Sequence, residues 1–511
     1  MKKRALLSVS DKTGLNDLAK ELIGLNYELI STGGTKKSLE EAGIQVIGVE
    51  DVTQAKEMLD GRVKTLHPSI HGGLLAIRSN PDHMAQIQSA GITPIDLVIV
   101  NLYPFKKTIS KPDFTVKEAI ENIDIGGPSM LRSAAKNHHD VTVICDPADY
   151  PVLLEQLHAN SETTLAFRQS MAAKVFRQTA AYDAMIAEYM TDLVGEENPE
   201  KFTATFELKQ TLRYGENPHQ KAWFYSTPFA EENALSSCVQ LHGKELSYNN
   251  IQDANAALQL LAEFDQPTAI GLKHTNPCGV GTADTLAEAW QKAYDSDPIS
   301  IFGGIVAFNR EVTLEIAEPL SNIFLEIVLA PSYTSEALEC LSKKKNIRLM
   351  TTDSAPARKF AKQFVRISGG LLVQDRDSIS ADLAKCTIVT TTQPTTAQYQ
   401  DALFGEKVCK HVKSNAIVIV KDGATLGIGA GQMNRVGSAE IALKQAGKKA
   451  IGATMASDAF FPMSDTVELA AQYGIAMIIQ PGGSIKDKDS IEECNKQGIA
   501  MVVTGERHFK H

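Results

Sequence analysis

The first 146 residues alternate short apolar segments with amphipathic ones, and this alternation restricts the fold more than any other feature. Residues 4–9 are typical of a buried strand, whereas residues 14–25 repeat apolar side chains with the period of a helix. Further strands are expected at residues 27–30, 44–49, 96–100 and 141–145. Strands that alternate with helices usually form one parallel sheet covered on both faces. We therefore expect a doubly wound α/β domain with its site at the carboxyl ends of the strands.

A glycine-rich turn follows the second predicted strand. Residues 31–35 read Ser-Thr-Gly-Gly-Thr and lead into a helix that carries Lys36 and Lys37. Glycines let backbone N–H groups approach an anion, and the positive end of a helix dipole favours a phosphate. The same residues are also compatible with a tight turn and an ordinary helix N-cap. On this motif alone, a phosphate cradle and a plain cap both stay open.

Functional side chains occupy several other turns of this domain. Lys64, Tyr103, Asp124 and Lys136 lie in separate turns, one in each. Scattered surface loops would not space such groups so regularly, so one site at a single edge of the sheet is the better interpretation.

The first domain is expected to end near residue 197. Residues 149–190 contain no glycine or proline after Pro151 and predict two helices. Residues 195–200, Gly-Glu-Glu-Asn-Pro-Glu, have the composition of a hinge. We accordingly expect a domain at 1–197, with an α/β core at 1–146, and a second domain at 198–511.

The second part of the chain contains a Lys-His pair at the end of a predicted strand. Residues 268–272 predict a buried strand, residues 276–279 a turn, and a helix is expected from Thr285. Lys273 and His274 would then lie at a strand end, where α/β sheets often carry chemistry. A lysine stabilises developing negative charge, and a histidine transfers protons near neutral pH. Many such pairs are solvated surface residues, so these residues alone leave both interpretations open.

Composition argues against several classes of protein. A chain of 511 residues is too long for one core. The formal net charge of −10 argues against nonspecific binding to nucleic acid or to an anionic membrane. No apolar run approaches the ~20 residues of a membrane-spanning helix. The seven cysteines are scattered and include no Cys-x-x-Cys pair, which favours free thiols in a reducing cytoplasm over disulfides or a zinc site. The sequence has no convincing repeat of fixed period.

A series of ordered motifs over essentially the whole length resembles the bifunctional purine-biosynthesis family that joins AICAR transformylase to IMP cyclohydrolase. Each motif alone is weak, but their joint order is highly specific. They are Ser-Val-Ser-Asp-Lys-Thr-Gly at 8–14, Gly-Gly-Thr at 33–35, Arg-Val-Lys-Thr-Leu-His-Pro at 62–68, Asn-Leu-Tyr-Pro-Phe at 101–105, Ile-Asp-Ile-Gly-Gly at 123–127, Leu-Arg-Tyr-Gly-Glu-Asn-Pro-His-Gln at 212–220, Lys-His at 273–274, Gly-Ile-Gly-Ala-Gly-Gln at 427–432 and Ser-Asp-Ala-Phe-Phe-Pro at 457–462.

The resemblance implies two consecutive reactions. The C-terminal part would transfer a formyl group from 10-formyltetrahydrofolate to the amine of AICAR, and the N-terminal part would close the product, FAICAR, to IMP with loss of water. The implied fold is a methylglyoxal-synthase-like doubly wound domain, followed by a transformylase domain of two cytidine-deaminase-like lobes. The implied protein is cytoplasmic and a homodimer, with transformylase sites at the subunit interface.

For formyl transfer, the resemblance assigns roles within the second domain. His274 matches the group that removes the amine proton, and Lys273 matches the group that stabilises the oxyanion or the leaving nitrogen. Substrate contacts match Arg213, Tyr214, Gly303, Glu326, Asn415, Arg435 and Arg507. Folate contacts match Val436, Phe460, Asp465, Ser484 and Ile485. Phe460 is equally compatible with ordinary core packing, and relatives carry aspartate at the position aligned with Glu326.

For cyclisation, the resemblance gives Lys136 the role of proton donor and acceptor. Lys64, Tyr103 and Asp124 match groups around the ring closure, where holding the reactive conformer does much of the work. The nucleotide cradle matches Ser10, Asp11, Lys12, Thr32, Gly33, Gly34, Thr35, Arg62, Val63, Thr65, Asn101 and Ile125. With this resemblance, the phosphate interpretation of the glycine-rich turn is favoured over the plain cap.

The remaining expectations concern metal ions and the function of the N-terminal domain. A monovalent cation (K+) near Asn415 and Asp458 is implied by the resemblance alone. Zinc hydrolysis is not expected, because the chain has neither a His-x-Glu nor a Cys-x-x-Cys motif. One alternative interpretation of the N-terminal domain is a regulatory nucleotide-binding module, but Lys64, Tyr103, Asp124 and Lys136 argue against it. The other is a lyase that acts on a triose phosphate.

Overall fold

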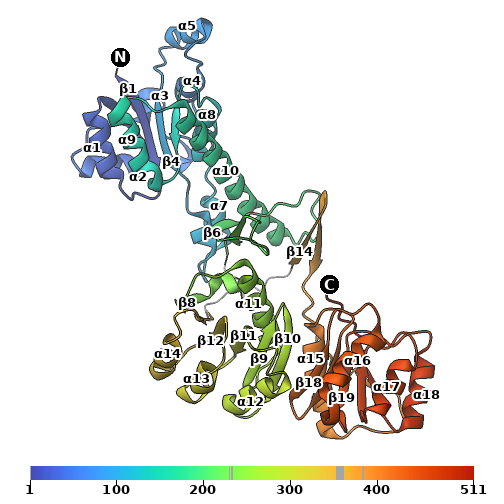
Figure 1. The fold of residues 1–511 in the computed structure, drawn as a ribbon. Helices are drawn as coiled ribbons and strands as arrows, with labels where there is room; N and C mark the ends of the chain where they lie inside the picture. The colour runs from blue at the N-terminus through green and yellow to red at the C-terminus, as the bar shows by residue number, and fades with distance from the viewer. Residues whose placement is uncertain (1, 230, 232–233, 353–361, 383–384) are drawn as a thin grey trace. The chain divides into compact units, whose positions relative to one another are not determined.

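The computed structural model describes residues 2–229, 231, 234–352, 362–382 and 385–511 (Figure 1). They divide into two units, Met1–Glu207 and Leu208–His511. The long helix α10 (Leu165–Val194) ends shortly before the predicted domain boundary after residue 197, which stays a prediction. Among the described residues, no helix is both long and apolar enough to span a membrane.

A five-stranded parallel sheet forms the centre of the first unit, in the order β3-β2-β1-β4-β5. The strands are β1 (Lys3–Val9), β2 (Tyr27–Ser31), β3 (Ile47–Gly48), β4 (Leu97–Asn101) and β5 (Thr142–Ile144). The chain builds outward from β1 to β3 and then returns to the other side of β1 with β4, so β1 and β4 flank the switch point of the sheet. The predicted doubly wound domain is therefore confirmed. The third strand, expected at residues 44–49, is shorter: residues 44–46 are not part of a strand, and helix α3 (Val49–Thr53) begins directly after it.

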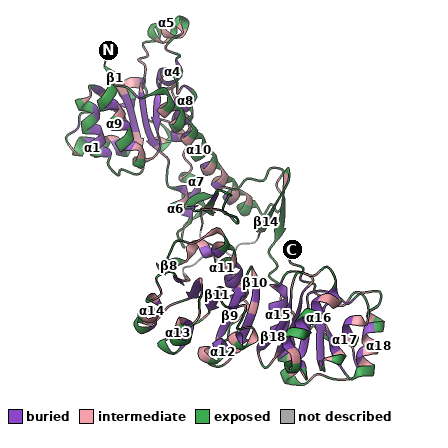
Figure 2. Ribbon diagram, in the orientation of Figure 1, coloured by how far each residue is buried: buried purple, intermediate pink, exposed green. Residues whose placement is uncertain are grey.

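Helices cover both faces of this sheet, and its strands are largely buried (Figure 2). Alternate side chains of the strands pack against the helices on the two faces. On one face, Leu7 packs with α1 (Leu15–Gly24), α2 (Gly33–Glu41) and α9 (Tyr150–Asn160). On the other face, Leu6 packs with α4 (Pro68–Leu75), α8 (Gly126–Lys136) and α10. This arrangement follows from the two-residue period of a strand, and it leaves the strand ends free for a site. The two helices predicted within residues 149–190 are α9 and α10. The remaining helices of the unit are α5 (Pro81–Ser89), α6 (Phe105–Ile109) and α7 (Val116–Glu121).

The second unit contains a mixed twelve-stranded sheet, in the order β16-β21-β20-β19-β17-β18-β10-β9-β11-β12-β13-β8. Its first half is built from β8 (Val239–His242), α11 (Tyr248–Leu261), β9 (Thr268–Lys273), β10 (Asn276–Thr282), α12 (Leu286–Ser296), β11 (Ile305–Phe308), α13 (Leu314–Ser321), β12 (Ile327–Ala330), α14 (Ser335–Ser342) and β13 (Arg348–Thr351). Its second half is built from β16 (Thr387–Ile388), α15 (Thr396–Lys410), β17 (Ile417–Lys421), β18 (Ala424–Gly429), α16 (Arg435–Ala446), β19 (Thr454–Ser457), α17 (Asp465–Gln472), β20 (Met477–Gln480), α18 (Asp487–Gln497) and β21 (Ala500–Val503).

These two halves, called the first lobe (residues 239–351) and the second lobe (residues 387–503), have the same topology. Each runs from a central hairpin through three parallel strands to an antiparallel edge strand. The lobes meet where β10 pairs with β18. The fold class predicted for this domain is confirmed. The sequence has no convincing repeat of fixed period, whereas the structure contains a repeat in its topology.

Glycines in the central strands let a helix lie directly against each hairpin. A Cβ atom at Gly279 would lie 2.0 Å from the carbonyl oxygen of Ala293 in α12, and one at Gly427 would lie 2.0 Å from that of Ala442 in α16. No side chain fits at such distances, so these positions require glycine. The motifs Gly-Val-Gly at 279–281 and Gly-Ile-Gly at 427–429 therefore serve helix packing in the two lobes.

The turn predicted at residues 276–279 is wrong. These residues begin strand β10, which pairs with β9 in a hairpin, and the turn consists of His274 and Thr275. Both have left-handed backbone conformations, with φ of 54° and 62°. The misplacement arose because Asn-Pro-Cys-Gly has turn composition, whereas His-Thr does not. The helix expected from Thr285 is present, and the Thr285 hydroxyl accepts the N–H of Glu288 as its N-cap.

Candidate active sites

A cavity of about 710 Å³ opens at the carboxyl ends of β1, β2 and β4 in the first unit. It lies at the switch point of the sheet, where ligands bind in doubly wound folds. Most of the residues predicted for the nucleotide cradle and the ring closure line it, namely Ser10, Lys12, Thr32, Gly33, Gly34, Thr35, Arg62, Lys64, Thr65, Asn101, Tyr103, Asp124 and Ile125. Asp11 and Val63 do not line it, although each is the chain neighbour of a residue that does.

Buried hydrogen bonds fix the glycine-rich turn against the first strand. The Thr35 hydroxyl accepts the N–H of Val9 at 2.9 Å and donates to the Val9 carbonyl at 3.0 Å. The Thr32 side chain makes no capping hydrogen bond at the start of α2. The plain-cap alternative thus lacks its defining contact, and the start of α2 faces the cavity.

A lysine and a carboxylate approach this cradle from other loops. The ammonium of Lys64 would lie 3.3 Å from a Cβ at Gly33, and it forms an ion pair of 3.1 Å with Glu57. The Asp124 carboxylate accepts N–H groups of Gly127 at 2.8 Å and of Tyr103 at 3.4 Å. Burial raises the pKa of Asp124, although these two bonds oppose the shift. Glu57 was not predicted from the sequence, because it does not lie next to any of the motifs.

Lys136 lies elsewhere. It is the last residue of α8, it is exposed, and it does not line the cavity. Gly126 and Gly127, at the other end of the same helix, do line the cavity. The chain then enters β5 from the amino-terminal edge of the sheet, so α8 spans from one edge of the sheet to the other.

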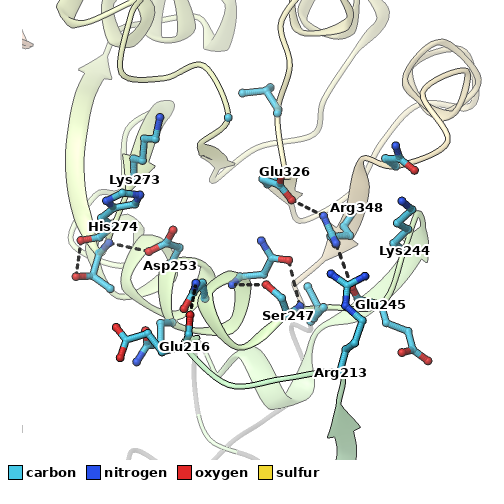
Figure 3. Close-up of a pocket in the computed structure, with 18 of the residues that line it drawn as sticks. Arg213, Glu216, Lys244, Glu245, Ser247, Asp253, Lys273, His274, Glu326 and Arg348 are labelled. Carbon is cyan, nitrogen blue, oxygen red and sulfur yellow. Dashed lines mark hydrogen bonds and ion pairs between the residues drawn. The ribbon is translucent and has the colours of Figure 1, made fainter. Parts of the chain in front are cut away.

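A larger cavity, of about 1080 Å³, lies in the second unit (Figure 3). The predicted residues that line it are Lys273, His274, Arg213, Tyr214, Gly303 and Glu326. Figure 3 shows Lys273 and His274 on one side of the pocket and three cationic side chains, Arg213, Lys244 and Arg348, on the opposite side. A ligand with an anionic end and a neutral reacting end fits this distribution of charge.

The β9–β10 hairpin places the Lys-His pair in the pocket. The Lys273 ammonium donates to the Phe302 carbonyl at 2.9 Å. Gly303, which follows, has a φ of 73°, and a Cβ there would lie 4.0 Å from the same ammonium. Thr275, in the turn, donates its N–H to the Asp253 carboxylate at 2.7 Å. Burial raises the pKa of Asp253, and the N–H groups of the turn oppose this shift.

Sequence reasoning missed several residues of this pocket. Arg348 forms an ion pair of 2.5 Å with Glu326 and donates to the Glu245 carbonyl. The other unassigned polar residues that line the pocket are Glu216, Lys244, Ser247, Asn249, Asn250, Gln252, Asp253, Thr275, Asn346 and Lys413. The polar run at 243–250 was the available signal, since it immediately precedes a helix.

The remaining predicted residues of formyl transfer lie outside this cavity, on or next to the second lobe. They are Asn415, Arg435, Val436, Phe460, Asp465, Ser484, Ile485 and Arg507. Arg435 is buried and forms an ion pair with Asp458, while the Asn415 amide donates to the Gln432 carbonyl at 2.7 Å. Phe460 is 38% exposed, so it is not the ordinary core residue that the sequence left open. Within one chain, the two groups of predicted residues do not line a common cavity.

The described part of the chain contains no group of three or more His, Cys, Asp or Glu side chains able to hold a metal ion. Within the described residues, Cys145, Cys278, Cys340, Cys386, Cys409 and Cys494 form no disulfide.

Comparison with known proteins gives a consistent result. The family described as AICARFT/IMPCHase bienzyme matches residues 134–445, and the MGS-like domain matches residues 14–129. The chain is 60% identical to the bifunctional purine biosynthesis protein PurH of Anoxybacillus flavithermus, over 100% of both chains. It is also 60% identical to PurH of Bacillus subtilis, over 100% of this chain and 99% of the relative. Among solved structures, ForH is 37% identical and covers 37% of this chain with all of its own, at a TM-score of 0.34, which is too low to bear on the fold.

Proposed function

This chain belongs to the AICARFT/IMPCHase bienzyme family, and from that premise we propose how its two cavities divide the work. It is a bifunctional enzyme of purine biosynthesis, with AICAR formyltransferase and IMP cyclohydrolase activities. The cavity of the second unit formylates AICAR, and the cavity of the first unit closes FAICAR to IMP. The observation that carries this assignment is the Lys273–His274 pair facing three cations across one pocket.

In formyl transfer, the phosphate of AICAR binds the cationic side of the pocket and its amine lies near His274. The amine is a poor nucleophile because its lone pair is delocalised into the ring. His274 accepts the amine proton as nitrogen attacks the formyl carbon of 10-formyltetrahydrofolate. Lys273, whose ammonium lies beside the Phe302 carbonyl, stabilises the oxyanion of the tetrahedral intermediate. The C–N bond to the folate then breaks, and the leaving nitrogen takes up a proton.

In cyclisation, the carboxamide nitrogen of FAICAR attacks its own formyl carbon, and water leaves. The glycine-rich turn at the start of α2 and the cations Lys12 and Arg62 hold the phosphate. Holding the reactive conformer supplies much of the rate. Lys64 stabilises charge that develops on the formyl oxygen, and Asp124, with a raised pKa, exchanges protons with the attacking nitrogen. Tyr103 borders the same cavity. The resemblance implies a proton-transfer role for Lys136, but Lys136 does not line this cavity, and no step is assigned to it here.

The active form is a homodimer, and its transformylase sites combine two chains. The predicted AICAR contacts Arg213, Tyr214 and Gly303 surround the cavity beside the first lobe, whereas the predicted folate contacts belong to the second lobe. A second copy would bring a second lobe to each cavity. The ribbon of β14 (Lys362–Ile367) and β15 (Gly370–Asp375) supports association, because it exposes Leu371, Leu372 and Val373, and an isolated two-stranded ribbon is marginal in water.

The monovalent cation implied by the resemblance does not fit the Asp458 carboxylate as it stands. This carboxylate is bound by Arg435, by the Ser414 hydroxyl and by the N–H of Ala416. No step of either reaction is assigned to such a cation. Cysteines that form no disulfide, among them Cys145, Cys409 and Cys494, support a reducing compartment, the cytoplasm.

An absorbance assay tests the division of work. The intact protein is given AICAR and 10-formyltetrahydrofolate, and both FAICAR and IMP are measured. We expect wild type to form IMP, and Lys64→Ala to accumulate FAICAR. IMP formation by Lys64→Ala at the wild-type rate would reject the first cavity as the site of cyclisation.

A further inference from the structure

The two lobes place the same kind of carboxylate beneath their central hairpins. In the first lobe, Asp253 of α11 accepts the N–H of Thr275 at 2.7 Å. In the second lobe, Asp401 of α15 accepts the N–H groups of Asp422 at 3.0 Å and of Gly423 at 2.9 Å. Asp401 follows Asp253 by 148 residues, and α15 starts 148 residues after α11. The two contacts are therefore equivalent under the internal repeat.

The two turns differ in how easily their residues adopt the required backbone. Asp422 and Gly423 have φ of 52° and 69°, and an Asp-Gly pair is a preferred sequence for this two-residue turn. His274 and Thr275 adopt the same left-handed geometry, which is unfavourable for a side chain with a Cβ and most unfavourable for a β-branched one. The His274–Thr275 turn therefore depends more on stabilising contacts than the Asp422–Gly423 turn does.

We propose that Asp253 is a positioning residue for formyl transfer, which holds the His274–Thr275 turn left-handed and thereby fixes His274 against the substrate. The inference rests on the proposed function of the second cavity. Figure 3 shows Asp253 beside the turn, at the base of the same pocket. In a relaxed turn Thr275 would move toward ordinary backbone angles, and the ring of His274 would turn with it.

Asn276 makes further contacts that hold the hairpin. Asn276, the first residue of β10, donates its amide to the His274 carbonyl at 3.1 Å and accepts the N–H of Lys413 at 3.0 Å. Because Asn276 still holds the hairpin, loss of Asp253 changes the conformation at His274 only locally. The cations across the pocket stay in place. A positioning role therefore predicts a loss in kcat with little change in KM for AICAR.

Two other roles for Asp253 are chemically possible and make different predictions. As a general base, its carboxylate would take the amine proton itself, and its amide would be inactive. As a substrate ligand, its removal would raise KM. A residue that only accepts backbone N–H bonds keeps most of its effect as asparagine, because the amide oxygen also accepts. Such a residue also becomes dispensable in a variant whose turn adopts the left-handed conformation without strain.

The test measures formyl transfer and cyclisation of added FAICAR in four full-length variants, Asp253→Ala, Asp253→Asn, Thr275→Gly, and Asp253→Ala combined with Thr275→Gly. We expect Asp253→Ala to lower kcat for transfer about 10- to 100-fold, with KM for AICAR within about threefold. Asp253→Asn should stay within about threefold of wild type. Thr275→Gly, which removes the backbone strain, should restore most of the activity lost in Asp253→Ala.

Asp401→Ala is the matched control, because it removes the same contact from the lobe without the Lys-His pair. It should change formyl transfer by less than about threefold. Equal losses in Asp253→Asn and Asp253→Ala would overturn the inference, as would a rise in KM alone or the absence of rescue by Thr275→Gly. If Asp253→Ala does not fold, as urea unfolding of the second unit would reveal, the isosteric Asp253→Asn decides alone. Failure of wild type to make FAICAR would reject the proposed function instead.

Discussion

The position of Lys136 allows a quantitative prediction about which lysine acts in cyclisation. Lys136 ends α8, an eleven-residue helix whose other end borders the first cavity. At 1.5 Å per residue, these ends lie about 15 Å apart, and an extended lysine side chain reaches about 6 Å. About 9 Å then separates its ammonium from the cavity, far beyond a hydrogen bond. Lys64 lines the cavity, with its ammonium close to Gly33.

We therefore expect Lys64→Ala to lower the rate of IMP formation from added FAICAR by about 100- to 1000-fold, the usual cost of losing one group that stabilises developing charge. Lys136→Ala should change this rate by less than about threefold. The assay follows the absorbance change on ring closure, and urea unfolding of the first unit serves as the control for folding. A 100-fold loss in Lys136→Ala with a normal Lys64→Ala would refute this geometry and support the role implied by the resemblance.

Three further predictions address assembly, pH and packing. In a mixture of equal amounts of Lys273→Ala and Arg435→Ala chains, random reassociation should restore about 25% of wild-type transfer. The reason is that half the dimers would be mixed, and each mixed dimer would hold one intact site of its two. If each site were formed within one chain, no activity would be recovered. Burial disfavours the imidazolium of His508, but Asp377 and Glu406 outweigh this effect and raise the pKa of His508 to about 9. Protonated His508 therefore stabilises the fold fully below pH ~6.5, and this stabilisation is lost as the pH rises through ~9, which lowers the free energy of unfolding by at most about 3 kcal/mol. The variant His508→Gln should abolish this part of the pH dependence in urea unfolding. Gly427→Ala should destabilise the second unit by about 1–3 kcal/mol, because its Cβ would collide with Ala442; unchanged unfolding would contradict the packing.

The sequence predicted the first unit well because local patterns there coincide with the tertiary structure. Apolar strands, amphipathic helices and the glycine-rich turn lie in chain order, and parallel pairing brings their ends together. Lys136 shows the limit of that reasoning. A residue between a helix and the next parallel strand lies at the amino-terminal edge of the sheet, and the sequence pattern did not show that Lys136 ends such a helix.

In the second unit, the hairpin at His274 and Thr275 was not predictable from turn preferences. Its left-handed conformation is supported by a carboxylate of α11, more than 20 residues earlier in the chain. The internal repeat escaped detection for a related reason. Topology constrains few side chains, among them Gly279 and Gly427 beneath the helices and Asp253 and Asp401 beneath the turns. The rest of each lobe requires only apolar side chains of suitable volume.

The separation of the two activities is tested most directly by Lys273→Ala, assayed twice. With AICAR and 10-formyltetrahydrofolate, this variant should form no measurable FAICAR or IMP, because the oxyanion loses its cation. With added FAICAR, it should form IMP at the wild-type rate, because the first cavity is unchanged. Loss of both activities in a variant that remains folded would contradict two independent sites.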